Sequence, residues 1–329
     1  MKSMRKYMIG AVIMIFAIML TACGQNNAIK LEEGKINVVT TIFPIYDFAK
    51  QIGGDHANVM NLIPTGVEPH DWTPKSQEIS VTSKAQLLLY NGAGLEGWIP
   101  NFLQGLGKDT PLKTVEVSHG IDMIHTEGDD GHHHDEEAGN KDEHDHVSDG
   151  AHGDDMYLDP HTWVSPKSAL IMAKNIKDSF IAVDAANQAD YETNYAKLEQ
   201  KLKDLDSKFE TELAKTSKKE IVVSHQAFGY LARDYGLTQK AVMGLSPEAE
   251  PRSQDIIELT KYVKEHNVKY IFFEELVSDQ IAKMLASEAK VETMVLNPIE
   301  GLTPEQDKSG ENYVTLMERN LQNLVKALQ

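Results

Sequence analysis

The feature that most constrains the fold is a long uninterrupted helical pattern near the middle of the chain. Residues 187–214 contain neither glycine nor proline, and apolar side chains recur among them at alternating steps of four and three residues. This spacing places the apolar side chains on one stripe of an α-helix that is roughly 40 Å long. The stripe consists of Tyr191, Tyr195, Leu198, Leu202, Leu205 and Phe209. We expect it to pack against a lobe of the protein, and the helix to be a stiff connector between two lobes.

Short apolar runs alternate with amphipathic segments on both sides of this helix. Before it, the pattern predicts strands at 36–43, 59–63, 86–90 and 114–117 and helices at 45–52, 96–105 and 165–183. After it, the pattern predicts strands at 220–224, 268–273 and 291–296 and helices at 253–266, 279–289 and 312–328. This alternation is typical of parallel sheets that are covered on both faces. The predicted fold class is therefore α/β, with two similar lobes (35–186 and 215–329) joined by the helix over 187–214. The order of the strands does not follow from the sequence.

The first residues predict export and attachment to a membrane. Three basic residues precede an apolar run over 7–20, which is short for a membrane span and typical of a signal peptide. The run ends in Leu-Thr-Ala-Cys, which resembles the lipobox of bacterial lipoproteins, in which the cysteine is lipidated and becomes the new N-terminus. Cys23 is the only cysteine, so it forms no intramolecular disulfide. An ordinary secretory signal with an incidental cysteine is the alternative.

The expected product of this processing is an extracytoplasmic protein. Residues 1–22 would be removed as the signal peptide, and residues 23–34 would form a lipidated tether on the bacterial cell membrane, with the lipid bilayer as a partner through Cys23. Removal of residues 1–22 deletes three positive charges and lowers the formal net charge from −18 to −21. Such an acidic surface argues against a nucleic-acid partner, whose phosphates need basic side chains. It suits a cation-handling role, although charge alone predicts only solubility.

One internal segment is unusually rich in histidine and acid. Residues 122–155 hold seven histidines and thirteen carboxylates, but only one basic residue, Lys141. Because almost every side chain is polar and glycine interrupts the segment, we expect a disordered loop without a packed core. A solvated acidic linker would explain the acids but not the clustered histidines. Imidazoles next to carboxylates instead indicate a weak, multi-site trap for divalent metal. Its histidines are His125, His132, His133, His134, His144, His146 and His152.

Two short segments repeat one pattern of acid, proline, histidine and tryptophan. They are 68–72, with the sequence EPHDW, and 159–163, with the sequence DPHTW. Proline fixes the backbone before each histidine, the acid can orient the imidazole, and the indole can exclude water. A further histidine, His225, directly follows the predicted strand at 220–224. We therefore expect His70, His161 and His225 to bind a metal. The histidines without such a setting are expected to be structural, namely His56, His119 and His266.

These segments together resemble the zinc and manganese substrate-binding lipoproteins of ABC transporters, in particular the zinc-uptake members with a histidine-rich loop. The resemblance covers the whole mature chain and includes SHQAFGY at 224–230 and LNPIEGLT at 296–303. It implies two lobes linked by a rigid helix, with one metal ion in the cleft between them. It also implies capture of Zn²⁺ outside the cytoplasm for an ABC transporter permease and its ATPase, with no enzymatic activity. By this resemblance, the ligands are His70 and His161 from the first lobe, and His225 and Glu300 from the second.

The fourth ligand and the metal have alternatives. In the resembling family the position of Glu300 varies, with aspartate in some members and water in some zinc-binding members. Glu274 and Glu275 are competitors on position alone, because they follow a predicted strand. Three imidazoles and one carboxylate favour tetrahedral zinc. Manganese prefers more oxygen ligands, and the resembling manganese binders have a carboxylate in place of His225.

Three other classes of function compete with zinc uptake. A manganese-binding protein or adhesin of the same family is one, and a storage protein whose histidine-rich loop holds the metal is another. A zinc hydrolase is the third, because three histidines and a water can activate a hydroxide. That enzyme would need an open coordination position and a substrate pocket, and the sequence contains neither an HExxH nor a GxSxG motif.

Overall fold

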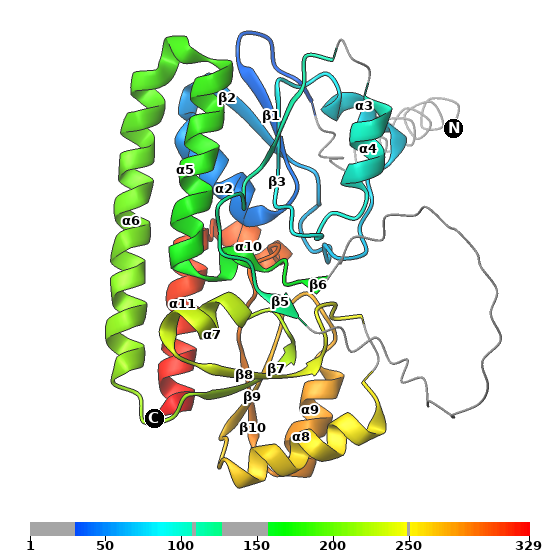
Figure 1. The fold of residues 1–329 in the computed structure, drawn as a ribbon, viewed down its shortest axis with the longest axis vertical. Coiled ribbons are helices and arrows are strands. Elements are labelled where there is room, and N and C mark those ends of the chain that lie inside the picture. Colours follow the sequence, from blue (N-terminus) through cyan, green and yellow to red (C-terminus); the bar gives the residue numbers. More distant parts are fainter. Residues whose placement is uncertain (1–29, 107–109, 127–156, 249–250) are drawn as a thin grey trace, which may run out of the picture. The chain divides into compact units, whose positions relative to one another are not determined.

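The computed structural model describes residues 30–106, 110–126, 157–248 and 251–329. The first lobe is built on a parallel sheet with the strand order β2-β1-β3-β4. Its strands are β1 (Ile36–Thr40), β2 (Ala57–Asn61), β3 (Leu87–Tyr90) and β4 (Lys113–Glu116). Its helices are α2 (Phe43–Gly53), α3 (Ser76–Thr82), α4 (Ile99–Gly105) and α5 (Pro166–Val183), with 3-10 turns at Gly54–His56 and Thr162–Val164. Figure 1 shows α5 on one side of this lobe and α3 and α4 on the other.

The second lobe repeats this architecture. Its parallel sheet has the strand order β10-β9-β7-β8, which is the order of the first lobe read from the opposite edge. The strands are β7 (Glu220–His225), β8 (Thr238–Met243), β9 (Tyr270–Phe273) and β10 (Glu292–Val295). The helices are α7 (Gly229–Tyr235), α8 (Ser253–Glu265), α9 (Gln280–Ala289), α10 (Pro304–Ser309) and α11 (Tyr313–Leu328). In both lobes the chain reverses its direction of strand addition between the first and third strands, which is where open parallel sheets place their ligands.

The long helix α6 (Gln188–Ala214) runs beside both lobes, after a 3-10 turn at Ala185–Asn187. Figure 1 shows it alongside α5 of the first lobe and α11 at the end of the chain. Its predicted stripe is buried except for Tyr195, which is half-buried. These side chains belong to one continuous apolar core that reaches from Val38 in β1 to Leu324 in α11. The lobes are therefore joined by packed side chains as well as by the chain itself.

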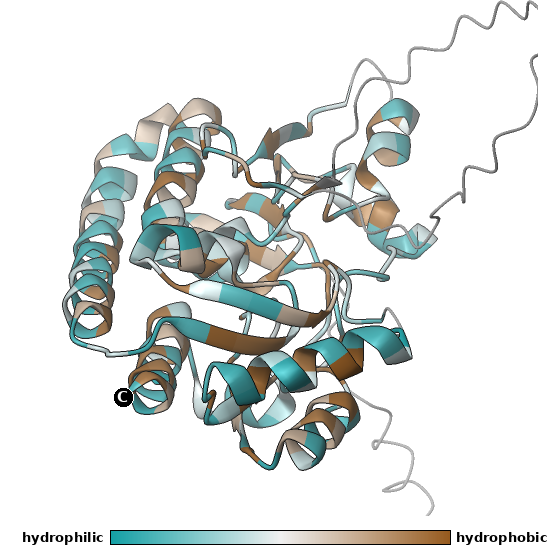
Figure 2. Ribbon diagram, turned by 60° about the horizontal axis from the view of Figure 1, so that its bottom comes forward, coloured by the Kyte–Doolittle hydropathy of each residue, from teal (hydrophilic) through white to brown (hydrophobic). Residues whose placement is uncertain are grey.

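A second, smaller apolar cluster lies in the second lobe. It joins Val222 and Ile271 of the sheet to Leu259 of α8 and Leu285 of α9. The alternate residues Ile221, Val223 and Phe272 belong to the larger core, so the sheet is covered on both faces. Figure 2 shows the outer helices with hydrophilic and hydrophobic sides, as expected when one stripe of a helix faces a sheet. The predicted α/β fold with two similar lobes is confirmed.

Several predicted boundaries were wrong for identifiable reasons. The first strand ends at Thr40 and not at 43, because Pro44 lies in the first turn of α2, where its missing N–H costs no hydrogen bond. In the same way α4 begins at Ile99, before Pro100, and the side chain of Glu96 folds back onto the backbone of Asn91. Six short elements were not predicted, namely α3, α7, α10, β5, β6 and β8.

The predicted start of the disordered loop, at residue 122, was too early. Residues 122–126 are ordered, and β5 (His125–Thr126) pairs with β6 (Tyr157–Leu158) in an antiparallel ladder. The backbone of Asp122 accepts a hydrogen bond from Arg233, and the backbone N–H of Ile124 donates to the hydroxyl of Tyr230. These contacts with the second lobe fix a segment that composition alone assigns to the loop.

Candidate metal centre

Four side chains from four different segments converge between the lobes. His70 lies in the loop after β2, and His161 lies three residues after the end of β6. His225 is the last residue of β7, so the strand extends one residue further than predicted. Glu300 lies in the loop between β10 and α10. One ligand atom from each residue lies within 4.8 Å of the others.

The spacing of these atoms fits one metal ion. The Nε2 atom of His161 lies 3.1 Å from Nε2 of His70 and 3.2 Å from Nε2 of His225. Oε1 of Glu300 lies 3.4, 3.3 and 3.7 Å from Nε2 of His70, His161 and His225, respectively. A tetrahedral zinc ion with bonds of about 2.0–2.1 Å requires ligand atoms that are ~3.3–3.4 Å apart. The five distances therefore lie close to the edges of such a tetrahedron.

The site is enclosed, and one of its atoms is left without a partner. His161 and His225 are fully buried, Glu300 is 3% exposed and His70 is 10% exposed. Oε1 of Glu300 is buried and forms no hydrogen bond with any described residue, although three imidazole nitrogens surround it. An unpaired buried carboxylate oxygen is costly, and a cation at this point would satisfy it.

Carboxylates orient two of the imidazoles. Nδ1 of His161 lies 2.8 Å from Oδ1 of Asp159, and Nδ1 of His225 lies 2.5 Å from Oε1 of Glu274. Hydrogen bonds of this kind hold a proton on Nδ1, so that a metal binds the imidazole through Nε2. Glu274, a possible ligand on sequence position, is thus the hydrogen-bond partner of a predicted ligand. Glu275 instead accepts hydrogen bonds from Asn297 (2.7 Å) and Gln306 (2.6 Å).

The two Pro-His segments differ in how they use their acid and tryptophan. Trp163 is fully buried, and its ring centroid lies 5.5 Å from that of His161. Its indole therefore shields this side of the site from water, as predicted. The expectation was wrong for the other segment. Both carboxylate oxygens of Glu68 accept the backbone N–H of His70 at 3.0 Å, and Trp72 packs on Trp98 with a centroid distance of 6.2 Å. Asp159 also accepts the backbone N–H of its histidine, His161, at 3.0 Å, so the two acids differ only in that Asp159 binds the imidazole as well.

The backbone on both sides of Glu300 is attached to the first lobe. The N–H of Phe43 donates to the carbonyl of Glu300 at 3.1 Å, and Nε1 of Trp163 donates to the carbonyl of Pro298 at 2.6 Å. Between them, Ile299 has a φ of +63°, a region that β-branched residues rarely adopt. Its N–H donates to Oδ1 of Asn297 at 2.6 Å, which helps to hold this conformation. Strained backbone of this kind is often found at functional sites.

Neighbouring groups shift the pKa values of Glu300, His161 and His225. Burial by itself raises the pKa of Glu300, but the imidazoles around it hold that pKa well below its usual range. Burial by itself lowers the pKa of His161, but the carboxylates of Asp159 and Glu300 outweigh burial and raise it. The same balance between burial and the carboxylates of Glu274 and Glu300 raises the pKa of His225 to about 10. The cluster therefore contains an ionised carboxylate, which attracts cations, and imidazoles that surround it.

Comparison with known proteins identifies the family. A family model described as "Zinc-uptake complex component A periplasmic" matches residues 38–327. The chain belongs to this family. It is 39% identical over 314 residues to the high-affinity zinc uptake system protein ZnuA of Bacillus subtilis, covering 94% of each chain. It is 41% identical over 308 residues to the zinc-binding lipoprotein AdcA of Streptococcus pneumoniae, covering 94% of this chain but only 58% of AdcA.

Solved structures of family relatives have the same fold. The Zn(II)-bound ZnuA-like domain of S. pneumoniae AdcA is 37% identical, with a TM-score of 0.73 over 90% of this chain and 99% of that one. The laminin-binding protein Lmb of Streptococcus agalactiae, described as a bifunctional protein with adhesin and metal transporting activity, is 26% identical. Its TM-score is 0.74 over 90% of this chain and 100% of that one. The resemblance to substrate-binding proteins of zinc uptake is thereby confirmed.

The remaining predicted site residues lie elsewhere. His125 is exposed on β5 and does not belong to the cluster. His56 pairs with Asp190 at 2.8 Å, His119 is exposed, and His266 stacks on Tyr262, so none of these three lies in the cluster. Outside the described residues are Cys23, His132, His133, His134, His144, His146 and His152.

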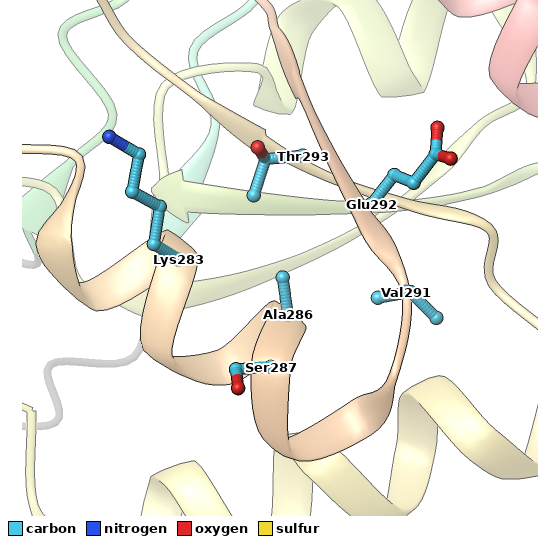
Figure 3. A pocket seen from close by; sticks show the side chains of 6 residues that line it. All are labelled: Lys283, Ala286, Ser287, Val291, Glu292 and Thr293. Carbon is cyan, nitrogen blue, oxygen red and sulfur yellow. The ribbon is translucent and has the colours of Figure 1, made fainter.

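A surface hollow of about 440 Å³ in the second lobe does not compete with this site (Figure 3). It lies between α9 and the beginning of β10, whereas the metal ligands lie beyond the carboxyl ends of the strands. It contains one carboxylate and no imidazole, so it lacks the ligands of a zinc site. Its lining residues are Lys283, Ala286, Ser287, Val291, Glu292 and Thr293.

Proposed function

We propose that this chain captures Zn²⁺ outside the cytoplasm and delivers it to the permease of an ABC transporter for zinc uptake. The observation that carries the proposal is the convergence of His70, His161, His225 and Glu300 at distances that suit one tetrahedral ion. The ion is the cargo, so the cleft is a binding site and not a catalytic centre. The names of the family relatives ZnuA and AdcA support zinc as that cargo.

The ligand set favours zinc over manganese. Manganese prefers oxygen ligands and usually six of them, whereas the cluster offers three nitrogens and one carboxylate. The enclosure of the site also limits the number of water molecules that could complete a larger coordination sphere. The same enclosure argues against a hydrolase, which needs an open position for water and substrate. None of the relatives quoted above is named as an enzyme.

The test of this function combines metal binding with uptake. We expect one tight zinc ion per chain and much weaker binding of Mn²⁺ when metal-free protein is titrated with each ion. Cells that lack the gene should accumulate less zinc from zinc-poor medium, and the intact gene should restore uptake. Equal affinities for the two ions, or normal uptake by the deleted strain, would argue against zinc capture and delivery.

Membrane attachment through Cys23 is a separate prediction. No helix in the described ranges is long and apolar enough to cross a bilayer, and Cys23 and the apolar run before it lie outside those ranges. Cys23→Ser should abolish lipidation, so the variant should be released or accumulate as an unprocessed precursor. Partitioning between detergent and water phases distinguishes the two forms. A processed variant that still fractionates with membranes would mean that Cys23 is not the anchor.

The histidine-rich segment is proposed to bind additional zinc weakly. Most of it lies outside the described residues, but the β5–β6 ladder brings Thr126 opposite Tyr157. Residues 127–156 can therefore be replaced by a two-residue asparagine–glycine turn that keeps the ladder. We expect calorimetry to show that this variant keeps one tight site and loses the weaker ones. The loop sites are expected to be weak because the chain that carries them loses conformational entropy when the metal binds. Loss of the tight site would mean that the segment supplies a primary ligand.

A further inference from the structure

The backbone at His161 has a conformation that needs support. His161 has φ −78° and ψ 45°, and the N–H of Thr162 donates to the carbonyl of Pro160 at 2.8 Å. A hydrogen bond between residues two apart defines an inverse γ-turn, with His161 as its central residue. Because this turn encloses only three residues, its own single hydrogen bond gives it little rigidity. The direction of the imidazole depends on this turn.

Asn91 binds both residues that flank His161. Nδ2 of Asn91 donates to the carbonyl of Pro160 at 2.8 Å, and the hydroxyl of Thr162 donates to Oδ1 of Asn91 at 2.8 Å. Asn91 and Thr162 are fully buried, so neither contact competes with water. The orientation of the amide is fixed as well, because the carbonyl of Pro160 can only accept a hydrogen bond. The side chain of Asn91 thus connects the two residues on either side of His161 by hydrogen bonds, although it does not contact the imidazole.

Asn91 is itself held in place by a buried carboxylate. Its backbone N–H donates to Oε1 of Glu96 at 2.8 Å, and the N–H of Gly92 donates to Oε2 at 3.0 Å. The hydroxyl of Thr41 donates to Oε1 of Glu96 at 2.5 Å. Gly92 has a φ of +85°, which lets the chain turn sharply after Asn91. The Glu96 carboxylate therefore anchors the chain at the end of β3.

The second lobe contains a counterpart of Asn91. In each lobe the third strand of the sheet lies next to the first, at the point where strand addition reverses. Asn91 directly follows the third strand of the first lobe, β3, and Glu274 directly follows the third strand of the second lobe, β9. Glu274 binds the imidazole of His225, while Asn91 binds the backbone around His161. The same topological position thus supports a metal ligand in both lobes.

We propose that Asn91 is a positioning residue of the zinc site, which sets the affinity by fixing the turn that carries His161. This inference rests on the proposed zinc-binding function. Without Asn91 the Pro160 carbonyl loses a buried donor, and the His161 turn can relax away from the geometry in which Nε2 faces the other ligands. The imidazole keeps its bond to Asp159, so the loss concerns the placement of the ring and not its tautomer.

Asn91→Ala should weaken zinc binding by about 10–100-fold, the usual range for residues that orient metal ligands. The matched control is Asn175→Ala, because Asn175 also donates to two backbone carbonyls, those of Val117 and His119, but contacts no ligand segment. Zinc affinity is measured by competition with a chelator, at a temperature where circular dichroism shows the metal-free variants to be folded. Co²⁺ replaces Zn²⁺ in a parallel experiment, because its visible spectrum reports tetrahedral geometry. We expect Asn91→Ala to change this spectrum and Asn175→Ala to leave it as in the unmodified protein.

Thr162→Val provides a second variant if Asn91→Ala does not fold. It removes the hydroxyl that binds Asn91 with little change in shape, so it should weaken zinc binding in the same direction but by less. When Asn91 is already alanine, Thr162→Val should reduce zinc affinity by a smaller factor than it does alone, because the hydroxyl of Thr162 acts through Asn91. Full additivity, or unchanged affinity and Co²⁺ spectrum in both single variants, would overturn the positioning role. A failure of the zinc site itself is distinguishable, because then the unmodified protein would bind zinc no more tightly than His161→Ala.

Discussion

We expect His161→Ala to weaken zinc binding on the order of 10²–10³-fold. Structural zinc sites with four ligands bind with about 10–16 kcal/mol at neutral pH, so each ligand accounts for roughly 2.5–4 kcal/mol, and each ~1.4 kcal/mol is tenfold in affinity. His161 is fully buried and lies nearest to the other ligand atoms, at 3.1 Å from His70 and 3.2 Å from His225. Alanine also leaves the buried carboxylate of Asp159 without its imidazole partner. Competition with a chelator of known zinc affinity measures the loss.

His56→Ala is the matched control for this substitution. His56 also pairs with an aspartate, Asp190, but at an exposed position away from the cluster. We expect its zinc affinity to equal that of the unmodified protein. If the two variants lost similar, small amounts of affinity, His161 would not be a ligand of the tight site.

Much of the fold could be predicted because its main elements have a clear period. The stripe on α6 is buried almost as its three- and four-residue spacing requires. The central strands β1 and β7 each contain a pair of adjacent valines and are buried along almost their whole length. The missed elements lack such a signal. β8 has the sequence TQKAVM and is an edge strand, so half of it is open to water and its pattern is mixed. In α3 only Thr82 is buried, so no apolar stripe reveals this helix.

The ligands of the candidate site were more accessible to sequence reasoning than their supports. His70 and His161 share a local pattern with proline and tryptophan, and His225 follows an apolar run, so each has a signal within a few residues. Glu300 has no such signal and was chosen by family resemblance.

Two supporting residues, Asn91 and Glu274, were missed in this role because their contacts are distant in the sequence. Asn91 binds Pro160, which is 69 residues away, and Glu274 binds His225, which is 49 residues away. A lone asparagine after a strand is typical of any turn. Only the strand order of the two sheets, which the sequence leaves open, shows that both residues stand at the same topological position.

We also expect zinc affinity to fall steeply as the pH drops from 7 to 5. In the metal-free protein the pKa values of His161 and His225 are raised, because nearby carboxylates outweigh the effect of burial. The imidazole of His225, whose pKa is about 10, is therefore protonated at neutral pH. The raised pKa of His161 means that it keeps its proton to a higher pH than an ordinary histidine. Zinc must displace these protons from Nε2 to bind. Each displaced proton makes the affinity fall about tenfold per pH unit. Two displaced protons therefore predict a loss of up to ~10⁴-fold over this range.

Loss of zinc between pH 7 and 5 should precede any unfolding. A histidine with a raised pKa contributes stability that is fully present below its ordinary pKa of about 6.5 and is lost as the pH rises through the folded value. Acidification therefore does not destabilise the metal-free protein through His161 or His225. Glu300 has a lowered pKa, so its contribution is lost only when the pH falls through a value well below the usual 4.5. Circular dichroism should accordingly report a folded chain at pH 5 while zinc is released.

Calorimetry at pH 7 in buffers with different ionisation enthalpies counts the protons released when zinc binds. We expect a value between one and two for the variant in which a short turn replaces residues 127–156, because that variant isolates the cleft from the loop histidines. In this background, His225→Ala should release fewer protons, because it removes an imidazole with a raised pKa. His56→Ala in the same background should release as many protons as the variant without this substitution. An affinity that stays constant between pH 7 and 5, or binding without proton release, would contradict a site built on protonated imidazoles.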